Sequence, residues 1–427
     1  MNVHFVMVNP KVIDLPTKDI LRAARRYPTP FFIYSEKKIR ANCSCFRDSF
    51  RSFFPTFDPL YAVKANTNPH LLKIIFSEGF GADASSEAEA WITGKLGGRG
   101  MYTGNYTTEQ EFRFVARTGI FMLNLDDISM LPTIKKIFTP NMPEFLSFRV
   151  NPGISKGGMK SLYLAGPDAK YGVPLEKIVE AYRCAKQMGV KRFGLHAMTG
   201  SNVLDEAYFE SVATILLDIA GRLKRELGIQ LERLNIGGGF GMPYRPEEKS
   251  LDLRRVAEGV RRAFDRQCAK YDMRAPILMA EPGRMIMADA GWLVGRVSVI
   301  KESYKKFAGI DAGMNDLPRP AIYDAYHHAT VVGRSLAGKK EKINIVGRLC
   351  ENNDQFAKDR LLPIVRVGDL IAIHNAGAHA YAMGHNYNNR LRSAEYLVAE
   401  KGAILKIRRA ETIQDLFRTV DPAAIKR

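Results

Sequence analysis

The apolar positions of this chain follow two successive patterns. Up to about Ala290, short apolar runs typical of buried parallel strands alternate with segments of helical periodicity. The eight runs are Leu60–Val63, Phe80–Asp83, Met101–Gly104, Phe121–Leu125, Leu146–Val150, Phe193–His196, Leu234–Ile236 and Ile277–Ala280. The helical segments between and after them include Pro69–Glu78, Glu87–Gly94, Glu109–Thr118, Leu175–Met188, Glu206–Leu227 and Leu251–Tyr271. Eight βα units over roughly 250 residues predict a closed (β/α)8 barrel of the TIM type rather than an open sheet.

After Ala290 the helical rhythm fades and strand-like stretches take over. They are Trp292–Val299, Ile343–Val346, Ile364–Val367 and Leu370–His374, with a turn signal at Gly368–Asp369. Another strand-like run, Phe31–Tyr34, could belong to either part. We therefore expect an α/β chain with two domains: a barrel over residues 36–290, and a second, mostly β domain formed by residues 1–35 and 291–427.

Composition is that of a globular enzyme. With 427 residues, 46% apolar and 25% charged, the chain can build two sizeable cores. It contains no apolar run of about 18 residues, and Met1–Pro10 lacks the basic-then-apolar order of a secretory signal, so we expect a cytoplasmic protein without a membrane partner. The five cysteines are odd in number and unpatterned, and no Cys/His set has metal-ligand spacing, so we expect neither a disulfide framework nor a metal site.

The formal net charge of +18 raises the question of a nucleic-acid partner. The basic residues are dispersed through amphipathic or mixed stretches, for example at Arg254–Arg255 and Lys305–Lys306. We interpret them as a solvated basic surface and expect no nucleic-acid binding. A positive field would also attract an anionic or zwitterionic small molecule.

Chemically distinctive residues stand at the carboxyl ends of five predicted strands. Lys64 ends the first run, Asp83 the second and His196 the sixth, while Gly237–Gly239 follow the seventh and Glu281–Arg284 the eighth. Active sites of such barrels gather at these ends, and phosphate is usually held after strands seven and eight. The pattern therefore predicts a single site that binds a phosphorylated ligand.

Each motif has a chemical and a plain structural interpretation. Lys64 follows apolar Tyr61–Val63, where burial would depress the amine pKa and favour imine formation, although a lysine at a strand end can also reach water. Glu281 can hold a protonated pyridine nitrogen and Arg284 can grip a carboxylate or phosphate, although the two could form an internal salt bridge.

The remaining motifs suit a cofactor ring and its phosphate. Gly237–Gly239 allow backbone amides to approach an anion, although glycines after a strand also make simple turns. His196 can stack on a ring, although a lone histidine is often a core residue, and Thr199 and Ser201 can donate to phosphate. Pyridoxal phosphate needs a lysine, an anion site and a charged partner for its ring nitrogen, and the set offers all three.

Two later stretches carry a family resemblance. They are Asp311–Pro320 with Tyr323, and Cys350–Pro363. With the motifs above, they make the chain resemble the alanine-racemase-fold decarboxylases that use pyridoxal phosphate, and within them the diaminopimelate decarboxylase branch, from about Pro30 to Val398. In the ornithine and arginine decarboxylase branches these stretches differ. The resemblance implies decarboxylation of meso-2,6-diaminopimelate to L-lysine by a homodimer with shared active sites.

The resemblance also implies residue roles. Lys64 is the imine lysine, Glu281 pairs with the pyridine nitrogen, and Cys350 donates a proton, with Cys350 and Glu351 reaching across the dimer interface. The expected catalytic residues are Lys64, Cys350 and His196. The expected cofactor contacts are Lys64, Asp83, His196, Thr199, Gly238, Gly239, Glu281, Gly283 and Arg284. The expected substrate contacts are Arg284, Arg319, Tyr323 and Glu351. A substrate with a second amino-acid end needs cations for its distal carboxylate and an anion for its distal ammonium, which agrees with this set.

Two departures from the family pattern leave the phosphate contact and the substrate open. Where the family commonly has Gly-Ala-Tyr, this chain has Gly377-Ala378-His379, so the hydroxyl near the phosphate is expected from Tyr381 or is replaced by the His379 imidazole. The loop His196-Ala-Met-Thr-Gly-Ser201 also matches the family's usual histidine-glycine-serine sequence only loosely. The substrate could therefore be another diamino acid, such as D-ornithine, D-lysine or carboxynorspermidine. The sequence is also compatible with a racemase and with a non-catalytic homologue that binds the cofactor or a partner protein.

Overall fold

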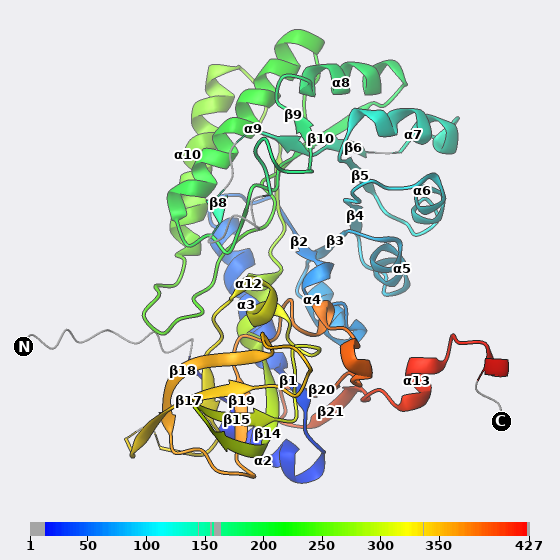
Figure 1. Cartoon of the computed structure of the whole chain (residues 1–427). Coiled ribbons are helices and arrows are strands. Elements are labelled where there is room, and N and C mark those ends of the chain that lie inside the picture. Colours follow the sequence, from blue (N-terminus) through cyan, green and yellow to red (C-terminus); the bar gives the residue numbers. More distant parts are fainter. Residues whose placement is uncertain (1–12, 144, 154–155, 158–163, 336, 425–427) are drawn as a thin grey trace, which may run out of the picture. The chain divides into compact units, whose positions relative to one another are not determined.

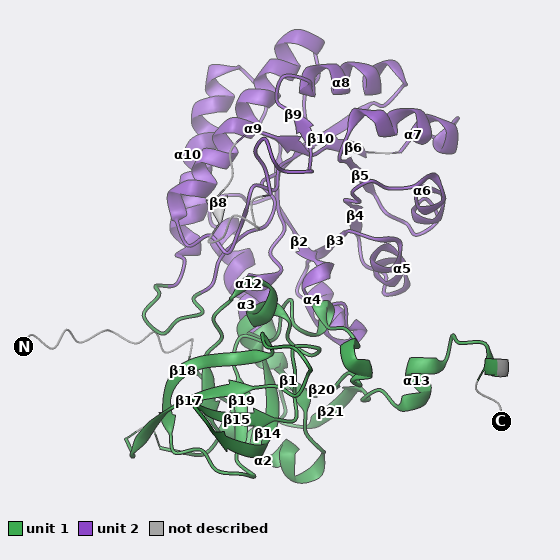
Figure 2. Ribbon diagram, viewed as in Figure 1, with its two compact units in different colours: residues 1–39, 243–249, 287–427 green, residues 40–242, 250–286 purple. Residues whose placement is uncertain are grey.

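The structure is a computed structural model that describes residues 13–143, 145–153, 156–157, 164–335 and 337–424. The stretch Met1–Pro10, expected not to be a secretory signal, lies outside these residues. The chain divides into two compact units (Figure 2). Unit 1 comprises residues 1–39, 243–249 and 287–427, and unit 2 comprises residues 40–242 and 250–286.

Unit 2 is a closed parallel barrel (Figure 1). Its strands are β2 (Phe57–Ala62), β3 (Gly81–Ala84), β4 (Gly100–Tyr102), β5 (Met122–Leu125), β6 (Phe145–Phe148), β10 (Arg192–His196), β12 (Arg233–Asn235) and β13 (Ile277–Ala280). Around the barrel they run in the order β10-β12-β13-β2-β3-β4-β5-β6, and every neighbouring pair is parallel. Each predicted run overlaps one of these strands, so the predicted (β/α)8 barrel is confirmed.

Helices precede, connect and follow these strands. They are α3 (Glu36–Arg51), η1 (Val63–Ala65), α4 (Pro69–Ser77), α5 (Glu87–Lys95), α6 (Glu109–Val115), η2 (Ile128–Met130), α7 (Leu131–Phe138), α8 (Ile178–Gln187), α9 (Glu206–Leu227), α10 (Leu253–Lys270) and α11 (Arg284–Met287). Short strands β7 (Val150–Asn151), β8 (Lys156–Gly157), β9 (Val173–Pro174) and β11 (Gly200–Ser201) lie in the connections. Polar caps begin several helices; Asp205, for example, accepts a bond from Ala207 N at the start of α9. Gly228 ends α9 with a left-handed φ of 64°, a C-cap that glycine favours.

Side chains fill the barrel interior and close its amino-terminal end. Leu60, Met101, Met122, Phe145 and Met279 form one buried cluster, with Phe121 packed against it. The guanidinium of Arg192 lies 3.8 Å from the centre of the Phe145 ring, that of Arg99 lies 4.4 Å from the Phe121 ring, and Arg233 contacts both rings. Carboxylates of Asp58 and Glu232 pair with these arginines. This end is therefore built for stability, which leaves chemistry to the opposite end.

Unit 1 is built on a mixed sheet. Its strands are β1 (Phe31–Ser35), β14 (Gly291–Glu302), β15 (Lys306–Ile310), β16 (Ala329–Val331), β17 (Lys340–Val346), β18 (Gln355–Pro363), β19 (Leu370–Ile373), β20 (Ala394–Val398) and β21 (Ile404–Arg408). Its helices are α2 (Thr17–Arg26), η4 (Ala288–Ala290), α12 (Arg319–Tyr323), η5 (Tyr381–Met383), η6 (Tyr387–Asn389), α13 (Ile413–Phe417) and η7 (Pro422–Ala424). The main path runs β18-β17-β15-β14-β1-β20-β21, with β19 also paired to β14. The predicted second, mostly β domain is thus confirmed, and β1 belongs to it.

One predicted strand is wrong. Ile364–Val367 has no strand conformation, whereas the preceding Gln355–Pro363 forms β18. Two amides of the predicted stretch bond to side chains instead of a neighbouring strand: Val365 N donates to Glu341 Oε1, and Arg366 N donates to Asp369 Oδ2. The apolar residues of this segment therefore belong to a turn, while β18 carries charged residues that hid its conformation from a hydrophobicity pattern. Of the helices that the structure describes, none is long and apolar enough to cross a membrane.

Candidate active site

Five polar residues converge at the carboxyl end of the barrel. Lys64 lies in η1 directly after β2, Asp83 lies in β3, His196 and Asn235 end β10 and β12, and Glu281 follows β13. The Lys64 Nζ is 3.3 Å from Asp83 Oδ2, and Asn235 Nδ2 donates to Glu281 Oε1 over 2.7 Å. The structure thus brings together residues that the sequence places at separate predicted strand ends.

Lys64 is an accessible amine among buried carboxylates. Its side chain is 46% exposed, whereas that of Asp83 is 1% exposed. Desolvation of the amine by the surrounding protein acts to lower the Lys64 pKa, but the charges of Asp83, Glu281 and Glu89 outweigh this effect, so the pKa is raised above its usual value. The predicted depression of the Lys64 pKa is therefore wrong for the chain by itself, since burial does not act alone here.

The two buried carboxylates differ in their ionisation. Burial raises the pKa of Asp83, and the nearby charge of Glu281 raises it further. Burial also acts to raise the pKa of Glu281, but His196, Lys64 and the bond from Asn235 bring it below its usual value. Glu281 is consequently the carboxylate that stays ionised while buried, which is what a partner for a protonated ring nitrogen requires.

His196 is held by one side chain and left unsatisfied on its other nitrogen. Asn124 Nδ2 lies 3.0 Å from His196 Nδ1, and this hydrogen bond fixes the orientation of the ring. Nε2 is 3.3 Å from Glu281 Oε1 but lacks hydrogen-bond geometry. A core histidine would have both nitrogens satisfied, so this ring is better suited to contact a ligand.

Glycines bring three loops into backbone contact beside this cluster. Gly237 and Gly239 have φ of +71° and +84°, where side chains are strained. A Cβ would lie 2.2 Å from Ala197 O at Gly237 and 2.6 Å from Glu281 O at Gly238. A Cβ on Gly283 would meet that of Ala65 at 3.0 Å. Backbone of this kind, free of side chains, is what an anion-binding loop needs.

Hydroxyls and a guanidinium flank the glycine loop. Arg284 Nη2 donates to Ser201 Oγ over 3.4 Å, and Thr199 Oγ1 is 2.5 Å from Tyr208 OH. These side chains, with the glycines, form a donor set suited to a phosphate group. The cluster therefore contains the three parts that pyridoxal phosphate needs: an accessible lysine, an ionised buried carboxylate and an anion loop.

Three buried atoms of the cluster support this fit. Among the residues with described positions, Asp83 Oδ1, His196 Nε2 and Asn124 Oδ1 are buried and have no hydrogen-bond partner. Buried polar atoms are normally satisfied, so these three point to a polar group that binds beside them. The residues present therefore fit the cofactor.

Sequence reasoning overlooked some polar residues of this end of the barrel. Asn124 and Arg149 both lie inside predicted apolar strands, and Arg149 is buried with its pKa lowered by that burial. Arg149 Nη2 donates to Leu164 O and Met198 O, and so fixes the loop that follows His196. Both residues could have been found from the sequence, because each is a polar residue inside an apolar run, near the carboxyl end of a predicted strand.

The other predicted site residues belong to unit 1. Arg319 is 6% exposed at the start of α12; its Nη1 is 2.7 Å from His327 Nε2, and its guanidinium lies 4.6 Å from the Tyr244 ring. Tyr323 ends α12 and is half-buried. Their predicted roles as substrate contacts stay predictions.

The connection between β17 and β18 carries the predicted proton donor. Cys350 and Glu351 are both exposed, and Cys350 N donates to Asn388 Oδ1 over 2.7 Å. His379 has a φ of +54°, and the Tyr381 ring is flanked by the guanidinium groups of Arg392 and Arg408 at 3.8 and 4.7 Å. Burial raises the Tyr381 pKa. The choice between His379 and Tyr381 as phosphate contact stays a prediction.

Comparison with known proteins identifies the family. Residues 36–288 match the pyridoxal binding domain of the pyridoxal-dependent decarboxylases. A diaminopimelate decarboxylase of Methanothermobacter thermautotrophicus is 39% identical over 94% of this chain and 93% of its own. Protein TabA of Pseudomonas amygdali pv. tabaci is 38% identical over 91% of this chain and 90% of its own. The crystal structure of diaminopimelate decarboxylase from M. jannaschii in complex with L-lysine has a TM-score of 0.86, with 32% identity and 95% of each chain covered. The chain therefore belongs to the family of pyridoxal-dependent decarboxylases.

Proposed function

We propose that this enzyme decarboxylates meso-2,6-diaminopimelate to L-lysine with pyridoxal phosphate as its cofactor. The observation that carries the proposal is the 39% identical relative, a diaminopimelate decarboxylase that aligns with 94% of the chain. The cluster around Lys64 and Glu281 supports it independently, because its chemistry suits this cofactor. The two arginines expected at the substrate suit a diamino diacid better than a simple amine.

The residues of the barrel end have distinct tasks in this proposal. Bound pyridoxal phosphate supplies an aldehyde for attachment of an amine and a ring that accepts electrons from the bond to the departing carboxylate. Lys64 would supply the amine that holds the cofactor at its aldehyde carbon. Glu281, ionised in its buried position, holds a proton at the ring nitrogen. Arg284, Ser201 and the glycine loop hold the phosphate.

Arg319 is the proposed contact for the distal carboxylate of the substrate. It is buried, and His327 and Tyr244 fix the direction of its guanidinium. A guanidinium fixed in this way binds a carboxylate with bidentate geometry. A substrate with a second carboxylate therefore binds more tightly than one without it. Arg284, Tyr323 and Glu351 complete the proposed substrate contacts, Glu351 by accepting from the distal ammonium.

We propose a cytoplasmic homodimer in which Cys350 and Glu351 serve the partner's site. Both side chains are exposed, so the surface of a partner subunit can contact them. Cys350 would return a proton to the substrate carbon that has lost its carboxylate. Mixing inactive Lys64→Ala and Cys350→Ala variants should restore about a quarter of wild-type activity if dimers exchange subunits randomly. Mixtures that exchange subunits and remain inactive would rule out shared sites.

The substrate is tested directly with a panel of acids. The cofactor-loaded enzyme is incubated with meso-2,6-diaminopimelate, D-lysine, D-ornithine, carboxynorspermidine, L-ornithine and L-arginine, and released carbon dioxide is measured with identification of the amine product. We expect meso-2,6-diaminopimelate to give the highest kcat/KM, with L-lysine as product, and Lys64→Ala to be inactive. A higher kcat/KM for any other acid would overturn the proposed substrate.

A second candidate is decarboxylation of another diamino acid by the same residues. The observation that favours it is His379, which stands where the family commonly has a tyrosine. The same panel decides between the two, and complete inactivity with retained cofactor binding would instead indicate a non-catalytic homologue.

A further inference from the structure

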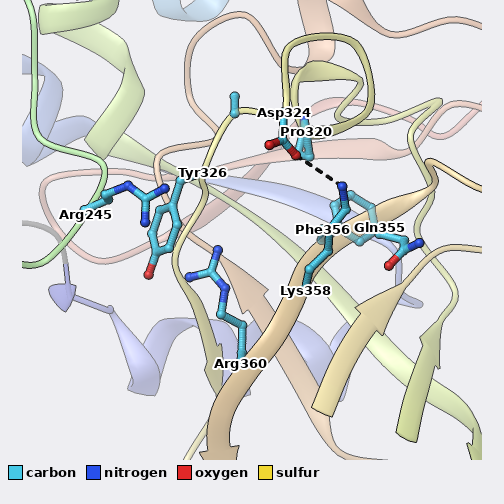
Figure 3. A pocket seen from close by; sticks show the side chains of 9 residues that line it. Arg245, Pro320, Asp324, Tyr326, Gln355, Phe356, Lys358 and Arg360 are labelled. Atoms are coloured by element: carbon cyan, nitrogen blue, oxygen red, sulfur yellow. Dashed lines mark hydrogen bonds and ion pairs between the residues drawn. The ribbon is translucent and has the colours of Figure 1, made fainter. Parts of the chain in front are cut away.

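A cavity in unit 1 lies beside helix α12, lined by residues that no proposed catalytic step uses (Figure 3). Its volume is about 350 Å³. Pro320 and Asp324 at α12 contribute one wall, β18 contributes Lys358 and Arg360, and Tyr326 and Arg245 complete it. All these residues belong to the same compact unit.

Two guanidinium groups meet at one aromatic ring in this cavity. The guanidinium carbon of Arg360 is 3.6 Å from the centre of the Tyr326 ring, and that of Arg245 is 4.5 Å from it. In Figure 3 the ring lies between the two side chains. Like charges this close repel each other, and the cation–π contacts offset only part of that cost.

The charge of the two arginines is not neutralised nearby. Among the described residues, neither arginine has a carboxylate within 4.0 Å, and the one carboxylate of the lining, Asp324, pairs instead with Lys358 at 3.1 Å. Glu247 is close enough to raise the pKa of Arg360, but burial lowers that pKa by more. The other titratable neighbour, His328, contacts Tyr326 OH at 3.3 Å and has its pKa lowered to about 4 by burial and by Arg360. The neighbouring histidine is thus neutral, and the wall is cationic.

We propose that this cavity binds a small oxyanion, a phosphate group or a carboxylate, at the edge of the Tyr326 ring, where the guanidinium groups of Arg245 and Arg360 flank it. A partly desolvated guanidinium is stabilised when a charged acceptor bonds to it, and two of them can grip one oxyanion from two sides. The lining contributes no carboxylate that competes with the ligand for these two groups. Tyr326 adds a polar atom, its hydroxyl, beside the two guanidinium groups.

The cavity is connected to the arginine assigned to the substrate. Arg245 follows Tyr244, and Tyr326 precedes His327; Tyr244 and His327 are the side chains that hold Arg319. Their two rings also contact each other, with centroids 5.1 Å apart. An oxyanion that draws Arg245 and Arg360 toward itself would thus displace both neighbours of Arg319. We expect it to change the KM for the proposed diamino diacid more than kcat, a consequence that rests on the proposed function.

Binding is tested on the cofactor-loaded enzyme, in which the cofactor's own phosphate site is filled. Calorimetric titrations use inorganic phosphate in one arm and succinate in the other, each at ionic strength matched with sodium chloride. We expect saturable binding of one ligand per chain, and the stronger arm identifies the source of the oxyanion. The double variant Arg245→Gln/Arg360→Gln should bind at least about tenfold more weakly, because it loses both charge-assisted contacts.

Matched variants separate this site from a general charge effect. Lys358→Gln removes a cation from the same wall, but one already paired with Asp324, so its affinity should stay within about twofold. Arg360→Lys keeps the positive charge but lacks the guanidinium, so this variant should fold and bind the anion with intermediate affinity. That result would show that the weaker binding of the double variant does not come from misfolding. No saturable binding to the wild type, or equal binding to the double variant, would overturn the site.

Two further measurements give distinct outcomes. If the double variant dissociates into monomers at concentrations where the wild type is a dimer, and the wild type binds neither anion, the arginine pair contacts a second copy and the proposal is overturned. If binding is saturable but KM for the diacid does not change, the connection to Arg319 fails while the binding site stands. An enzyme that binds the anion but has no activity on the acid panel refutes the proposed function alone.

Discussion

Substitution of Gly237 by alanine tests how the glycine loop shapes the cofactor site. Two effects act at this position. The φ of +71° is strained for alanine by about 1–2 kcal/mol. The new Cβ would also lie 2.2 Å from Ala197 O, so the loops must separate by more than about 1 Å to restore ordinary contact at 3.4 Å.

This separation would displace the loop that carries Thr199 and Ser201. A 1 Å error in positioned groups costs on the order of 10²-fold in rate, so we expect Gly237→Ala to bind pyridoxal phosphate at least about tenfold more weakly and to lose most of its turnover. The assay removes the cofactor, titrates it back while following its visible absorbance, and measures the melting temperature in parallel.

Gly228→Ala provides a matched control. Gly228 has a similar φ of +64°, but a Cβ there has no heavy atom within 4 Å. This variant should therefore lose about 1 kcal/mol of stability from backbone strain while keeping wild-type cofactor affinity. Our interpretation of the loop would be refuted if Gly237→Ala bound the cofactor as tightly as Gly228→Ala does.

Three further predictions concern the ring nitrogen, a buried acid and the barrel's closed end. Glu281→Gln should retain bound cofactor but lose at least about 10²-fold in kcat, because the amide cannot hold the ring proton; a kcat within about threefold of wild type would contradict this role. Burial raises the pKa of Asp316 to about 6, so the protonated carboxyl stabilises the folded state at low pH. This contribution to the free energy of unfolding, about 3 kcal/mol, is lost as the pH rises through 6. Wild-type stability relative to Asp316→Asn should therefore fall between about pH 4 and 6.5 in denaturant titrations, and a difference that is flat with pH would refute the assignment. Arg233→Met should lower the free energy of unfolding by about 1–3 kcal/mol while leaving kcat and KM unchanged, because Arg233 contacts Phe121 and Phe145 at the end away from the site; altered kinetics in the folded variant would contradict that separation.

The barrel could be predicted from the sequence because each βα unit is encoded locally. Every buried strand appears as an apolar run, and parallel strands in a barrel necessarily bring their carboxyl ends together. The convergence of Lys64, Asp83, His196 and Glu281 follows from that topology alone. The limits of β18 could not be predicted in the same way, since its charged residues interrupt the hydrophobic pattern.

The electrostatics of the site could not be predicted from local sequence. Lys64 has its pKa raised because Asp83 and Glu281, far from it in the chain, lie beside it in space. The contact of Asn124 with His196 likewise joins two strands that are not consecutive. Residues 243–249 join unit 1 although the barrel sequence surrounds them on both sides. Their prolines and charged residues indicate a loop, but local sequence does not say which unit that loop joins.

The central claim is that Lys64 tethers the cofactor at the carboxyl end of the barrel. Reduction of the cofactor-loaded protein with borohydride, followed by peptide mass spectrometry, tests it most directly, because reduction makes the bond between lysine and cofactor permanent. We predict a phosphopyridoxyl group on Lys64 in the wild type and on no residue in Lys64→Ala. A label on a different lysine, or its persistence in Lys64→Ala, would contradict the account.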